Sequence, residues 1–286
     1  MRILLTGSAG RIGQRQTNYL LQAGYEIRTF DKTAKKKDWD WEHISGDLRD
    51  LATVRNLMSG VDAVVHMGAI ANDQHGNDEG VFGTNVMGTW NVLQAGLEAG
   101  VQKYVLFSSV NALGAVGGHR PPVQFPVGDD YPRHPMTPYQ LSKHVGEDMG
   151  ASFSAKHGIQ AISFRPGYVT LPENYKDMVN HKKENDKWGR TEFWGYIDIR
   201  DVCNAVMLAL KNETIKADAF LLMASDTSVL TPSRELVEEF WGEIPWIGDK
   251  DAYFVGNPNR SLFDTTHSAE VLGWKPDHSW RDPSSR

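Results

Sequence analysis

The stretch Thr6-Gly7-Ser8-Ala9-Gly10-Arg11-Ile12-Gly13 stands between a short apolar run at 2–6 and a segment at 11–22 whose apolar residues recur at helical spacing. The run predicts a buried strand, and the segment predicts a helix that Gly24 closes. Three glycines therefore lie where a strand turns into a helix. At such a turn, backbone amides can approach a pyrophosphate at the positive end of the helix, so the stretch indicates a dinucleotide site.

The three glycines and the acid that ends the second strand have distinct roles at this predicted site. Gly7 permits the tight turn, Gly10 the close approach to the pyrophosphate, and Gly13 the packing of helix on sheet. Asp31 follows the next apolar run, where a carboxylate can accept both ribose hydroxyls of an adenosine and repel a 2′-phosphate. NAD is therefore favoured over NADP, although Lys32 weakens this preference because a lysine can neutralise a phosphate.

A further acid follows the third predicted strand, which lies around Ile44. Asp47, in the triplet Gly46-Asp47-Leu48, is placed to receive the adenine amino group. The alternative is that Asp47 caps a helix that begins near Asp50, because aspartate is a favoured N-cap residue. The sequence leaves both interpretations open.

Short apolar runs alternate with amphipathic segments through the first two thirds of the chain. This alternation is typical of βαβ units around a parallel sheet. Strands are predicted at 2–6, 25–30, around Ile44, 62–66, 103–107 and 160–164. Helices are predicted at 11–22, 81–99 and 138–157, each followed by a glycine. The predicted fold class is α/β, a Rossmann-type doubly wound parallel sheet with a small C-terminal substrate lobe.

The character of the sequence changes after Arg165-Pro166-Gly167, where a polar stretch at 174–190 is predicted to be a loop or lid. The sheet pattern returns with a strand at 196–198, a helix at 200–210 and a strand at 219–223. From Thr231 the remainder is predicted to form a small separate lobe. We therefore assign residues 1–165 and 196–225 to an NAD-binding Rossmann domain, and residues 166–195 and 226–286 to a small substrate-binding lobe.

Composition argues against several classes of protein. The chain has 286 residues, of which 40% are hydrophobic and 23% charged, as in ordinary globular proteins. The net charge is −6 and the basic residues are scattered apart from 35–37, so no nucleic-acid partner is predicted. No apolar run approaches the roughly 20 residues that span a bilayer. With a single cysteine, Cys203, and no leader before the first apolar run, we expect a cytoplasmic protein.

A tyrosine and a lysine four residues apart indicate acid–base chemistry. Tyr139 and Lys143 share one face of the helix predicted at 138–157, so both are expected to point into the same cleft. A tyrosine has an ordinary pKa of about 10, and it becomes a useful base only when nearby positive charge stabilises its phenolate. Lys143 and a cationic nicotinamide can supply that charge.

Ser109 follows the strand at 103–107, at the sheet edge where ligands of such folds bind, and can orient a substrate oxygen.

Eight landmarks fall in the order found in a known family. They are Thr6-Gly7-x-x-Gly10-x-x-Gly13, Asp31, Gly46-Asp47-Leu48, His66-Met67-Gly68-Ala69, Asn85, Phe107-Ser108-Ser109, Tyr139-x-x-x-Lys143 and Arg165-Pro166-Gly167. The chain thereby resembles the extended short-chain dehydrogenase/reductases, also called the NAD-dependent epimerase/dehydratase family, over nearly its whole length. The resemblance implies an enzyme in which Ser109, Tyr139 and Lys143 are catalytic and Asn85 supports the geometry of the site. The NAD contacts that it implies are Gly7, Gly10, Arg11, Ile12, Gly13, Asp31, Asp47, Leu48, Met67, Gly68, Ala69, Tyr139 and Lys143.

Within this family the chain is most similar to the compact uronate dehydrogenases and related sugar dehydrogenases. The similarity lies in Pro172-Glu173-Asn174-Tyr175, Leu262-Phe263-Asp264-Thr265 and Leu272-Gly273-Trp274-Lys275-Pro276. Uronate dehydrogenases place an arginine after the Asn-Tyr pair to hold the carboxylate. This chain has Lys176 there, a point charge without the bidentate fork, which weakens the case for a uronate. The implied substrate contacts are Ala71, Ser109, Asn111, Arg165, Tyr168, Asn174 and Lys176.

The main hypothesis is an NAD-dependent dehydrogenase that oxidises a hydroxyl of a sugar or sugar acid. The alternative is an NAD-dependent nucleotide-sugar epimerase or dehydratase, because the same groups can return the hydride to the opposite face of the sugar. A minor alternative is a non-catalytic NAD-binding sensor. The family also implies a homodimer that pairs the helices at 81–99 and 138–157 in a four-helix bundle. No metal site is predicted, since the ten histidines show no ligand spacing.

Overall fold

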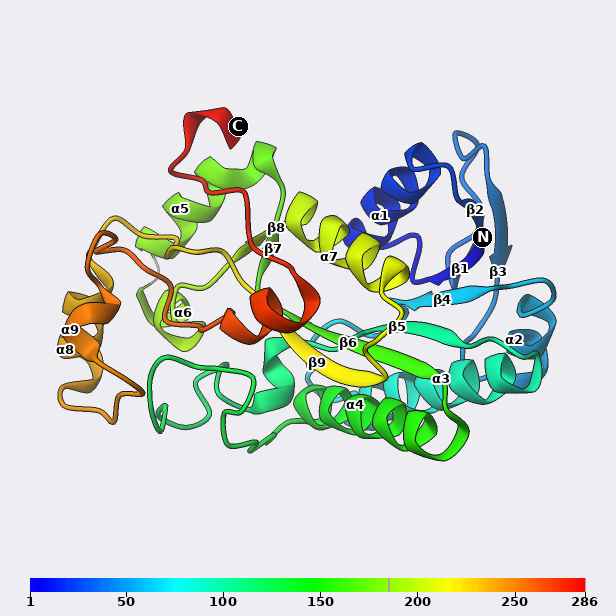
Figure 1. Ribbon diagram of the computed structural model, residues 1–286, viewed down its shortest axis with the longest axis horizontal. Coiled ribbons are helices and arrows are strands. Elements are labelled where there is room, and N and C mark those ends of the chain that lie inside the picture. The colour runs from blue at the N-terminus through cyan, green and yellow to red at the C-terminus, as the bar shows by residue number, and fades with distance from the viewer. Residues whose placement is uncertain (185, 286) are drawn as a thin grey trace.

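Seven parallel strands form the central sheet of the protein (Figure 1). The computed structural model describes residues 1–184 and 186–285 and, apart from those of 181–188, their side chains. The strands are β1 (Arg2–Thr6), β2 (Glu26–Asp31), β3 (Glu42–Ser45), β4 (Ala63–His66), β5 (Lys103–Phe107), β6 (Gln160–Pro166) and β9 (Ala217–Leu222). Their order in the sheet is β3-β2-β1-β4-β5-β6-β9. The chain first adds strands on one side of β1 and then, from β4 onward, adds them on the other side. Ligands of open α/β sheets bind at such a reversal, outside the carboxyl ends of the strands.

Helices cover both faces of the sheet, and alternate strand residues point into two separate cores. Helices α1 (Arg11–Gln22) and α7 (Ile199–Lys211) cover one face, and α2 (Leu51–Leu57), α3 (Asp78–Glu98) and α4 (Pro138–His157) the other. On β1, Ile3 and Leu5 belong to the first core, whereas Leu4 belongs to the second. All three side chains are fully buried, as expected for a parallel strand covered on both faces. The α/β, doubly wound fold class predicted from the sequence is confirmed.

The small lobe has an aromatic core of its own. Phe125, Phe193 and Trp241 pack with ring centroids 5.1 to 5.5 Å apart. Other elements outside the main sheet and its covering helices are β7 (Val169–Thr170), β8 (Ile197–Asp198), α8 (Ser233–Trp241), α9 (Lys250–Tyr253), 3₁₀ turns at Val110–Leu113 and Pro283–Ser285, and a π-helical turn at Ser268–Leu272. The loop after β5, from Val110 to Tyr131, also contributes to the aromatic core. The predicted division into a Rossmann domain (1–165 and 196–225) and a small lobe (166–195 and 226–286) stays a prediction. The loop after β5 belongs to the first part by sequence but packs into the core of the second.

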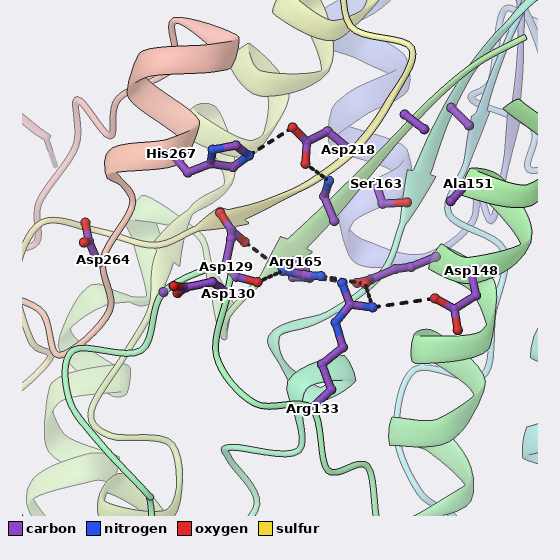
Figure 2. A pocket seen from close by; sticks show the side chains of 15 residues that line it. Asp129, Asp130, Arg133, Asp148, Ala151, Ser163, Arg165, Asp218, Asp264 and His267 are labelled. Atoms are coloured by element: carbon purple, nitrogen blue, oxygen red, sulfur yellow. Dashed lines mark hydrogen bonds and ion pairs between the residues drawn. The ribbon is translucent and has the colours of Figure 1, made fainter. Parts of the chain in front are cut away.

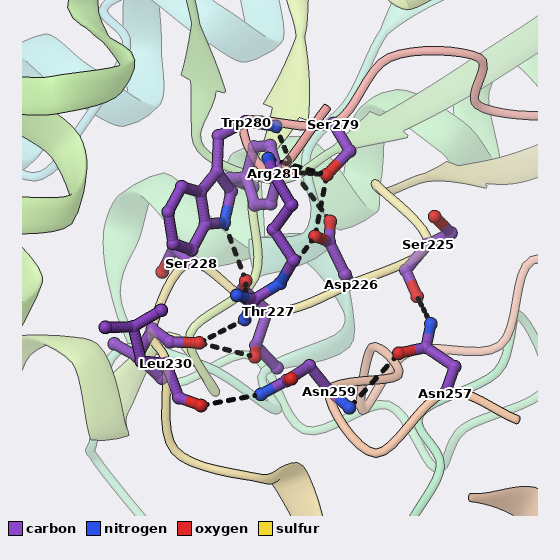
Figure 3. A network of polar contacts seen from close by, with 12 residues as sticks. Ser225, Asp226, Thr227, Ser228, Leu230, Asn257, Asn259, Ser279, Trp280 and Arg281 are labelled. Atoms are coloured by element: carbon purple, nitrogen blue, oxygen red, sulfur yellow. Dashed lines mark hydrogen bonds and ion pairs between the residues drawn. The ribbon is translucent and has the colours of Figure 1, made fainter. Parts of the chain in front are cut away.

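The C-terminal segment is tied to the loop that follows β9 (Figure 3). The buried Asp226 carboxylate accepts hydrogen bonds from the Tyr196 hydroxyl at 2.6 Å and from Ser279 Oγ at 2.7 Å. The Trp280 indole N–H donates to the carbonyl oxygen of Thr227 at 2.9 Å. These bonds satisfy a carboxylate that burial would otherwise penalise, so they fix the end of the chain against the lobe.

The polar stretch at 174–190 is largely helical, so its prediction as a loop or lid was wrong. After a 3₁₀ turn at Pro172–Asn174, it forms α5 (Tyr175–Glu184) and α6 (Asp186–Thr191). Tyr175 and Met178 lie about one turn apart on α5 and are buried in a cluster with Tyr196. Two apolar residues at this spacing anchor an amphipathic helix even where the composition is polar. In residues 1–184 and 186–285, no helix combines the length and the apolarity that crossing a membrane requires.

Candidate functional site

A cleft of about 650 Å³ lies along the carboxyl ends of β1, β2, β4 and β5. It brings together most of the residues that the sequence predicted for the site. These are Gly7, Gly10, Arg11, Ile12, Gly13, Asp31, Asp47, Leu48, Met67, Gly68, Ala69, Ala71, Ser109, Asn111, Tyr139, Lys143 and Tyr168. Four other predicted residues, Asn85, Arg165, Asn174 and Lys176, are not among those that line the cleft. Segments up to about 160 positions apart in the chain thus meet at one edge of the sheet.

The glycine turn between β1 and α1 fits a pyrophosphate. Gly7 has a φ of +74°, and a Cβ there would lie 2.7 Å from the amide nitrogen of Gly68. A Cβ on Gly13 would collide with the carbonyl oxygen of Gly7. Gly10 is the N-cap residue of α1 and no side chain caps this end of the helix. The first amides of α1 therefore face the cleft as donors suited to phosphate oxygens.

Two carboxylates lie at the adenosine end of the cleft. Asp31 is held by backbone N–H donors, from Ala9 at 3.0 Å and from Thr33 at 2.9 Å. Asp47 accepts hydrogen bonds from the backbone and guanidinium of Arg49, which lower the pKa of its carboxyl to about 2. Both side chains therefore offer carboxyl oxygens as acceptors suited to ribose hydroxyls and an adenine amino group.

The alternative role for Asp47, as a helix cap, falls to another residue. Helix α2 begins at Leu51, and its N-cap is Asp50, whose side chain accepts the backbone N–H of Ala52 at 3.0 Å. Asp47 lines the cleft instead. The cofactor contact remains a prediction for Asp47, since no bound ligand defines it.

Substitution Asp31→Asn is expected to shift cofactor preference toward NADP. The amide keeps an oxygen that can accept the Ala9 N–H, but the charge that repels a 2′-phosphate is lost, and Lys32 stands next to the site. The ratio of Kd for NADP to Kd for NAD should fall by about tenfold, roughly 1.4 kcal/mol. Fluorescence titration measures both constants without turnover. The control is Asp38→Asn, in the exposed loop after β2, which should leave the ratio unchanged. If Asp31→Asn also leaves the ratio unchanged, Asp31 does not select against the 2′-phosphate.

The reacting end of the cleft is built from β5 and the first turns of α4. Ser109 follows β5, and its Oγ accepts the backbone N–H of Asn111 at 3.2 Å. Tyr139 is the second residue of α4, and Lys143 lies one turn further on. The Lys143 ammonium donates to the carbonyl oxygen of Phe107 at 2.7 Å and lies 5.8 Å from the centroid of the Tyr139 ring. Ser109, Tyr139 and Lys143 therefore converge on one place.

Burial shifts the pKa values of Tyr139 and Lys143. Burial raises the pKa of Tyr139 to about 12, while a hydrogen bond with the Ser109 side chain opposes the rise. Burial also lowers the pKa of Lys143 to about 8, opposed by the charge of Glu147. The phenol is therefore protonated at neutral pH in the protein alone, and a positive charge beside it would favour the phenolate. A nicotinamide cation bound in the cleft is a charge of that kind.

Glu147 is a buried acid beside the cleft that the sequence analysis missed. Its buried carboxylate lies one turn after Lys143 on α4 and accepts a hydrogen bond from Ser108 Oγ at 2.6 Å. The same carboxylate receives the guanidinium of Arg165 at 2.9 and 2.7 Å. Its spacing of four residues from Lys143 is the one signal in the sequence that points to it.

His66 is a second residue whose role the sequence did not reveal. Its ring lies between Thr6 Oγ1, 2.7 Å from Nδ1, and Thr89 Oγ1, 3.2 Å from Nε2. Burial, together with the charge of Lys143, lowers the pKa of His66 to about 3, so the ring is neutral. It links β1, β4 and α3 beneath the cleft, which is a structural role.

Asn85 lies behind the cleft and not in it. Its side-chain amide accepts the backbone N–H of Ile70 at 2.8 Å and donates to the Ile70 carbonyl at 3.0 Å and to Ser142 Oγ at 3.0 Å. It therefore connects the loop after β4 to α4, next to Tyr139 and Lys143. This position suits the supporting role that the family resemblance implies.

Arg165 does not face the cleft, contrary to its prediction as a substrate contact (Figure 2). The side chain is fully buried, and its guanidinium binds the Glu147 carboxylate and, at 2.9 and 3.0 Å, the carbonyl and carboxylate oxygens of Asp129. It lines a separate cavity of about 560 Å³ between α4, β6 and β9. The residues after it, Pro166 and Gly167, line the cleft instead. Arg165 is therefore placed as a structural cation.

The two remaining substrate candidates lie outside the cleft lining. Asn174 ends the 3₁₀ turn before α5, and its backbone N–H donates to the carbonyl of Leu171 at 2.9 Å. Lys176 is exposed near the start of α5. Among residues 1–184 and 186–285, no group of three or more His, Cys, Asp or Glu side chains is arranged to hold a metal ion.

The sequence matches one family model and several curated proteins. The model of the NAD dependent epimerase/dehydratase family matches residues 3–221. Uronate dehydrogenase of Pseudomonas putida is 33% identical over 188 residues, covering 65% of this chain and 68% of that protein. UDP-glucose 4-epimerase of Lactobacillus helveticus is 26% identical over 315 residues, covering 97% of this chain and 93% of that protein.

A solved structure shares the fold. It is a short-chain dehydrogenase/reductase superfamily protein of Agrobacterium tumefaciens with bound NAD, superposed at a TM-score of 0.73 with 21% identity, covering 98% of this chain and 94% of that chain. The resemblance seen in the sequence and the expected cofactor, NAD, are confirmed at the level of the family. With its glycine turn, its convergent Ser109, Tyr139 and Lys143, and a family match over most of its length, the chain belongs to the NAD-dependent epimerase/dehydratase family.

Proposed function

We propose that this enzyme is an NAD-dependent dehydrogenase that oxidises a hydroxyl group of a sugar. The observation that carries the proposal is the convergence of Ser109, Tyr139 and Lys143 in the same cleft as the glycine turn and Asp31. A proton acceptor, an oxygen-positioning hydroxyl and a cation thus share one space with a dinucleotide cradle. Oxidation of an alcohol needs those parts together, because a proton and a hydride leave the same carbinol.

Each of the three side chains has its own part in the proposed reaction. Ser109 Oγ holds the substrate oxygen, and the Tyr139 phenolate takes its proton as the carbonyl forms. Lys143 stabilises that phenolate and would hold the nicotinamide ribose. Bound NAD would supply positive charge beside the phenol before the reaction and an acceptor for the hydride that leaves the carbinol carbon. Proton and hydride together account for the two electrons and two hydrogens that the alcohol loses.

Epimerisation of a nucleotide sugar is the second candidate function. The 26% identity with UDP-glucose 4-epimerase extends over 97% of the chain, whereas the 33% identity with uronate dehydrogenase extends over 65%. The same three side chains serve both reactions. The two differ in whether the reduced cofactor returns its hydride to the sugar.

A single mixing experiment separates these functions. Purified protein is incubated with NAD and a panel of free aldoses, uronates and UDP-sugars, and NADH absorbance and sugar products are followed. Accumulation of NADH with loss of the sugar supports the dehydrogenase. A new epimer without NADH supports the epimerase, and bound NAD without any product supports a non-catalytic sensor.

The cytoplasmic homodimer expected from the sequence also remains a proposal. Met87 and Trp90 on α3 and Leu141 on α4 have exposed fractions of 48%, 43% and 40%, so both helices carry apolar surface. Pairing these helices with those of a second copy would remove that surface from water. Sedimentation should give twice the chain mass of 32.0 kDa, and a monomer at micromolar concentration would contradict the dimer.

A further inference from the structure

A second cavity lies at the edge of the sheet, away from the cleft (Figure 2). It measures about 560 Å³ and is bounded by α4, β6 and β9, the last strand in the order of the sheet. The cleft and this cavity have no lining residue in common. Its volume lies within the range of pockets that hold small organic molecules. The cavity is therefore large enough for a ligand of its own.

Small side chains create this space. In the parallel pair of β6 and β9, Ala161 lies opposite Ala217, and Ser163 lies opposite Ala219. Residues two apart on a strand point to the same face, so these four side chains form one floor. Ala151 of α4 also lines the cavity. Alanine and serine are too short to fill the space between the strands and the helix, so a hollow with a largely apolar floor remains.

One polar side chain of this floor, that of Ser163, has no partner. The residue is 3% exposed and lines the cavity. Within the part of the chain that the structure describes, no residue forms a hydrogen bond with its Oγ. Ser163 also borders a void of about 20 Å³ that has room for one water at most, so a larger ligand can reach the hydroxyl only from the cavity. Because buried hydroxyls are rarely left without a partner, Ser163 indicates a place where a ligand forms a hydrogen bond.

The lining of the cavity is acidic. Six carboxyl side chains face two guanidiniums and one imidazole, namely Asp129, Asp130, Glu147, Asp148, Asp218 and Asp264 with Arg133, Arg165 and His267. Two carboxylates remain in excess even when His267 and His144, which lies 3.5 Å from Asp148, are both counted as cations. The cavity therefore attracts cations and repels anions.

Two of these acids have no basic partner. Asp264 accepts hydrogen bonds from the backbone N–H and the hydroxyl of Thr266, at 2.9 and 2.5 Å, and both donors are neutral. Among residues 1–184 and 186–285, none donates to the Asp130 carboxylate. Figure 2 shows both acids on the opposite side of the cavity from Ser163. The basic groups are taken up by the other acids: Arg165 by Asp129 and Glu147, Arg133 by Glu147 and Asp148, and His267 by Asp218.

We propose that this cavity is a second binding site, which takes an aliphatic diamine or polyamine. One ammonium group binds the carboxylates of Asp130 and Asp264 through charge-assisted hydrogen bonds. The alkyl stem lies on the alanine floor, and a second amine donates to Ser163 Oγ. An organic cation is favoured over a metal ion because, in the described part of the chain, no three His, Cys, Asp or Glu side chains are arranged to hold one. The inference does not depend on the proposed oxidation, since no residue that lines the cleft takes part.

Titration calorimetry tests the site without any need for turnover. The full chain, saturated with NAD so that the cleft is filled, is titrated with 1,4-diaminobutane and with spermidine at pH 8 and low salt. Two further probes separate charge from shape: 1,4-butanediol has the same chain without charge, and Mg²⁺ has the charge without the stem. Each amine should bind at one site per chain. The diol and Mg²⁺ should bind at least about tenfold more weakly than the diamine.

Two variants of the cavity locate the binding. Asp130→Asn, which keeps the shape and removes a charge, and Ser163→Ala, which removes the hydroxyl, should each raise Kd for 1,4-diaminobutane by at least about threefold. Asp38→Asn is the matched control, because this exposed acid follows β2, at the other end of the sheet. An unchanged Kd for NAD shows that each variant is folded. The absence of saturable amine binding, equal affinity for Mg²⁺, or an unchanged amine Kd in either cavity variant would overturn the inference.

Discussion

Substitution Tyr139→Phe is expected to lower kcat/KM for the oxidised sugar by about 10³-fold, within the range found for positioned general acids and bases. The phenol lies beside both Ser109 and Lys143, where it can take the substrate proton. Phenylalanine keeps the buried ring at this position of α4 and removes only the hydroxyl. Steady-state kinetics with NAD and the sugar found in the mixing experiment measure the effect.

Cofactor binding separates a chemical role for Tyr139 from a structural one. Because the glycine turn and Asp31 are untouched, Tyr139→Phe should bind NAD with a Kd within about threefold of the wild-type value. Tyr19→Phe, at an exposed position on α1, is the matched control and should keep full activity. Undiminished turnover by Tyr139→Phe would remove the proposed base and with it the reaction scheme.

Substitution Arg165→Met is expected to lower the free energy of unfolding by about 3–5 kcal/mol, the cost of removing one partner from a buried ion pair. The guanidinium binds Glu147 at 2.7 Å and Asp129 at 3.0 Å, and the side chains of these acids are 4% and 11% exposed. Without this cation, the Asp129 carboxylate loses the guanidinium that pairs with it, and Glu147 keeps Arg133, whose side chain is 34% exposed, at 3.3 Å. Urea unfolding followed by circular dichroism measures the change. Arg2→Met, which breaks an exposed pair with Glu26, should cost less than about 1 kcal/mol.

The loss in Arg165→Met should depend on pH. Burial raises the pKa of Asp129 to about 6, and the charge of Arg165 opposes that rise. Removing Arg165 raises this pKa further, so the folded variant favours the protonated acid. A folded-state pKa above the unfolded value means that the penalty is relieved below it and grows as pH increases through it. The destabilisation should therefore be larger near about pH 8 than near about pH 5, and the reverse order would contradict the ion-pair role of Arg165.

The local signals in the sequence led to residues that line the same cleft. The glycine turn depends on backbone geometry within eight residues, because Gly7 has a φ of +74° and a Cβ on Gly13 would collide with the carbonyl oxygen of Gly7. Tyr139 and Lys143 face the same cleft because four residues make about one helical turn. Asp31 and Ser109 could be placed because parallel strands end at the same edge of a sheet. In each case the determining distance is short along the chain or is set by the regular sheet.

The sequence did not correctly place residues whose neighbours come from remote segments of the chain. Arg165 lies directly before cleft residues, but Asp129 and Glu147 draw its guanidinium to the other side of β6. Helix α5 forms in a polar stretch because Tyr175 and Met178 find buried partners. The sequence by itself determined the glycine turn and the shared helix face of Tyr139 and Lys143, since these follow from local backbone geometry. Only the tertiary structure decided that Arg165 is buried against Asp129 and Glu147, because packing alone brings these three segments of the chain together.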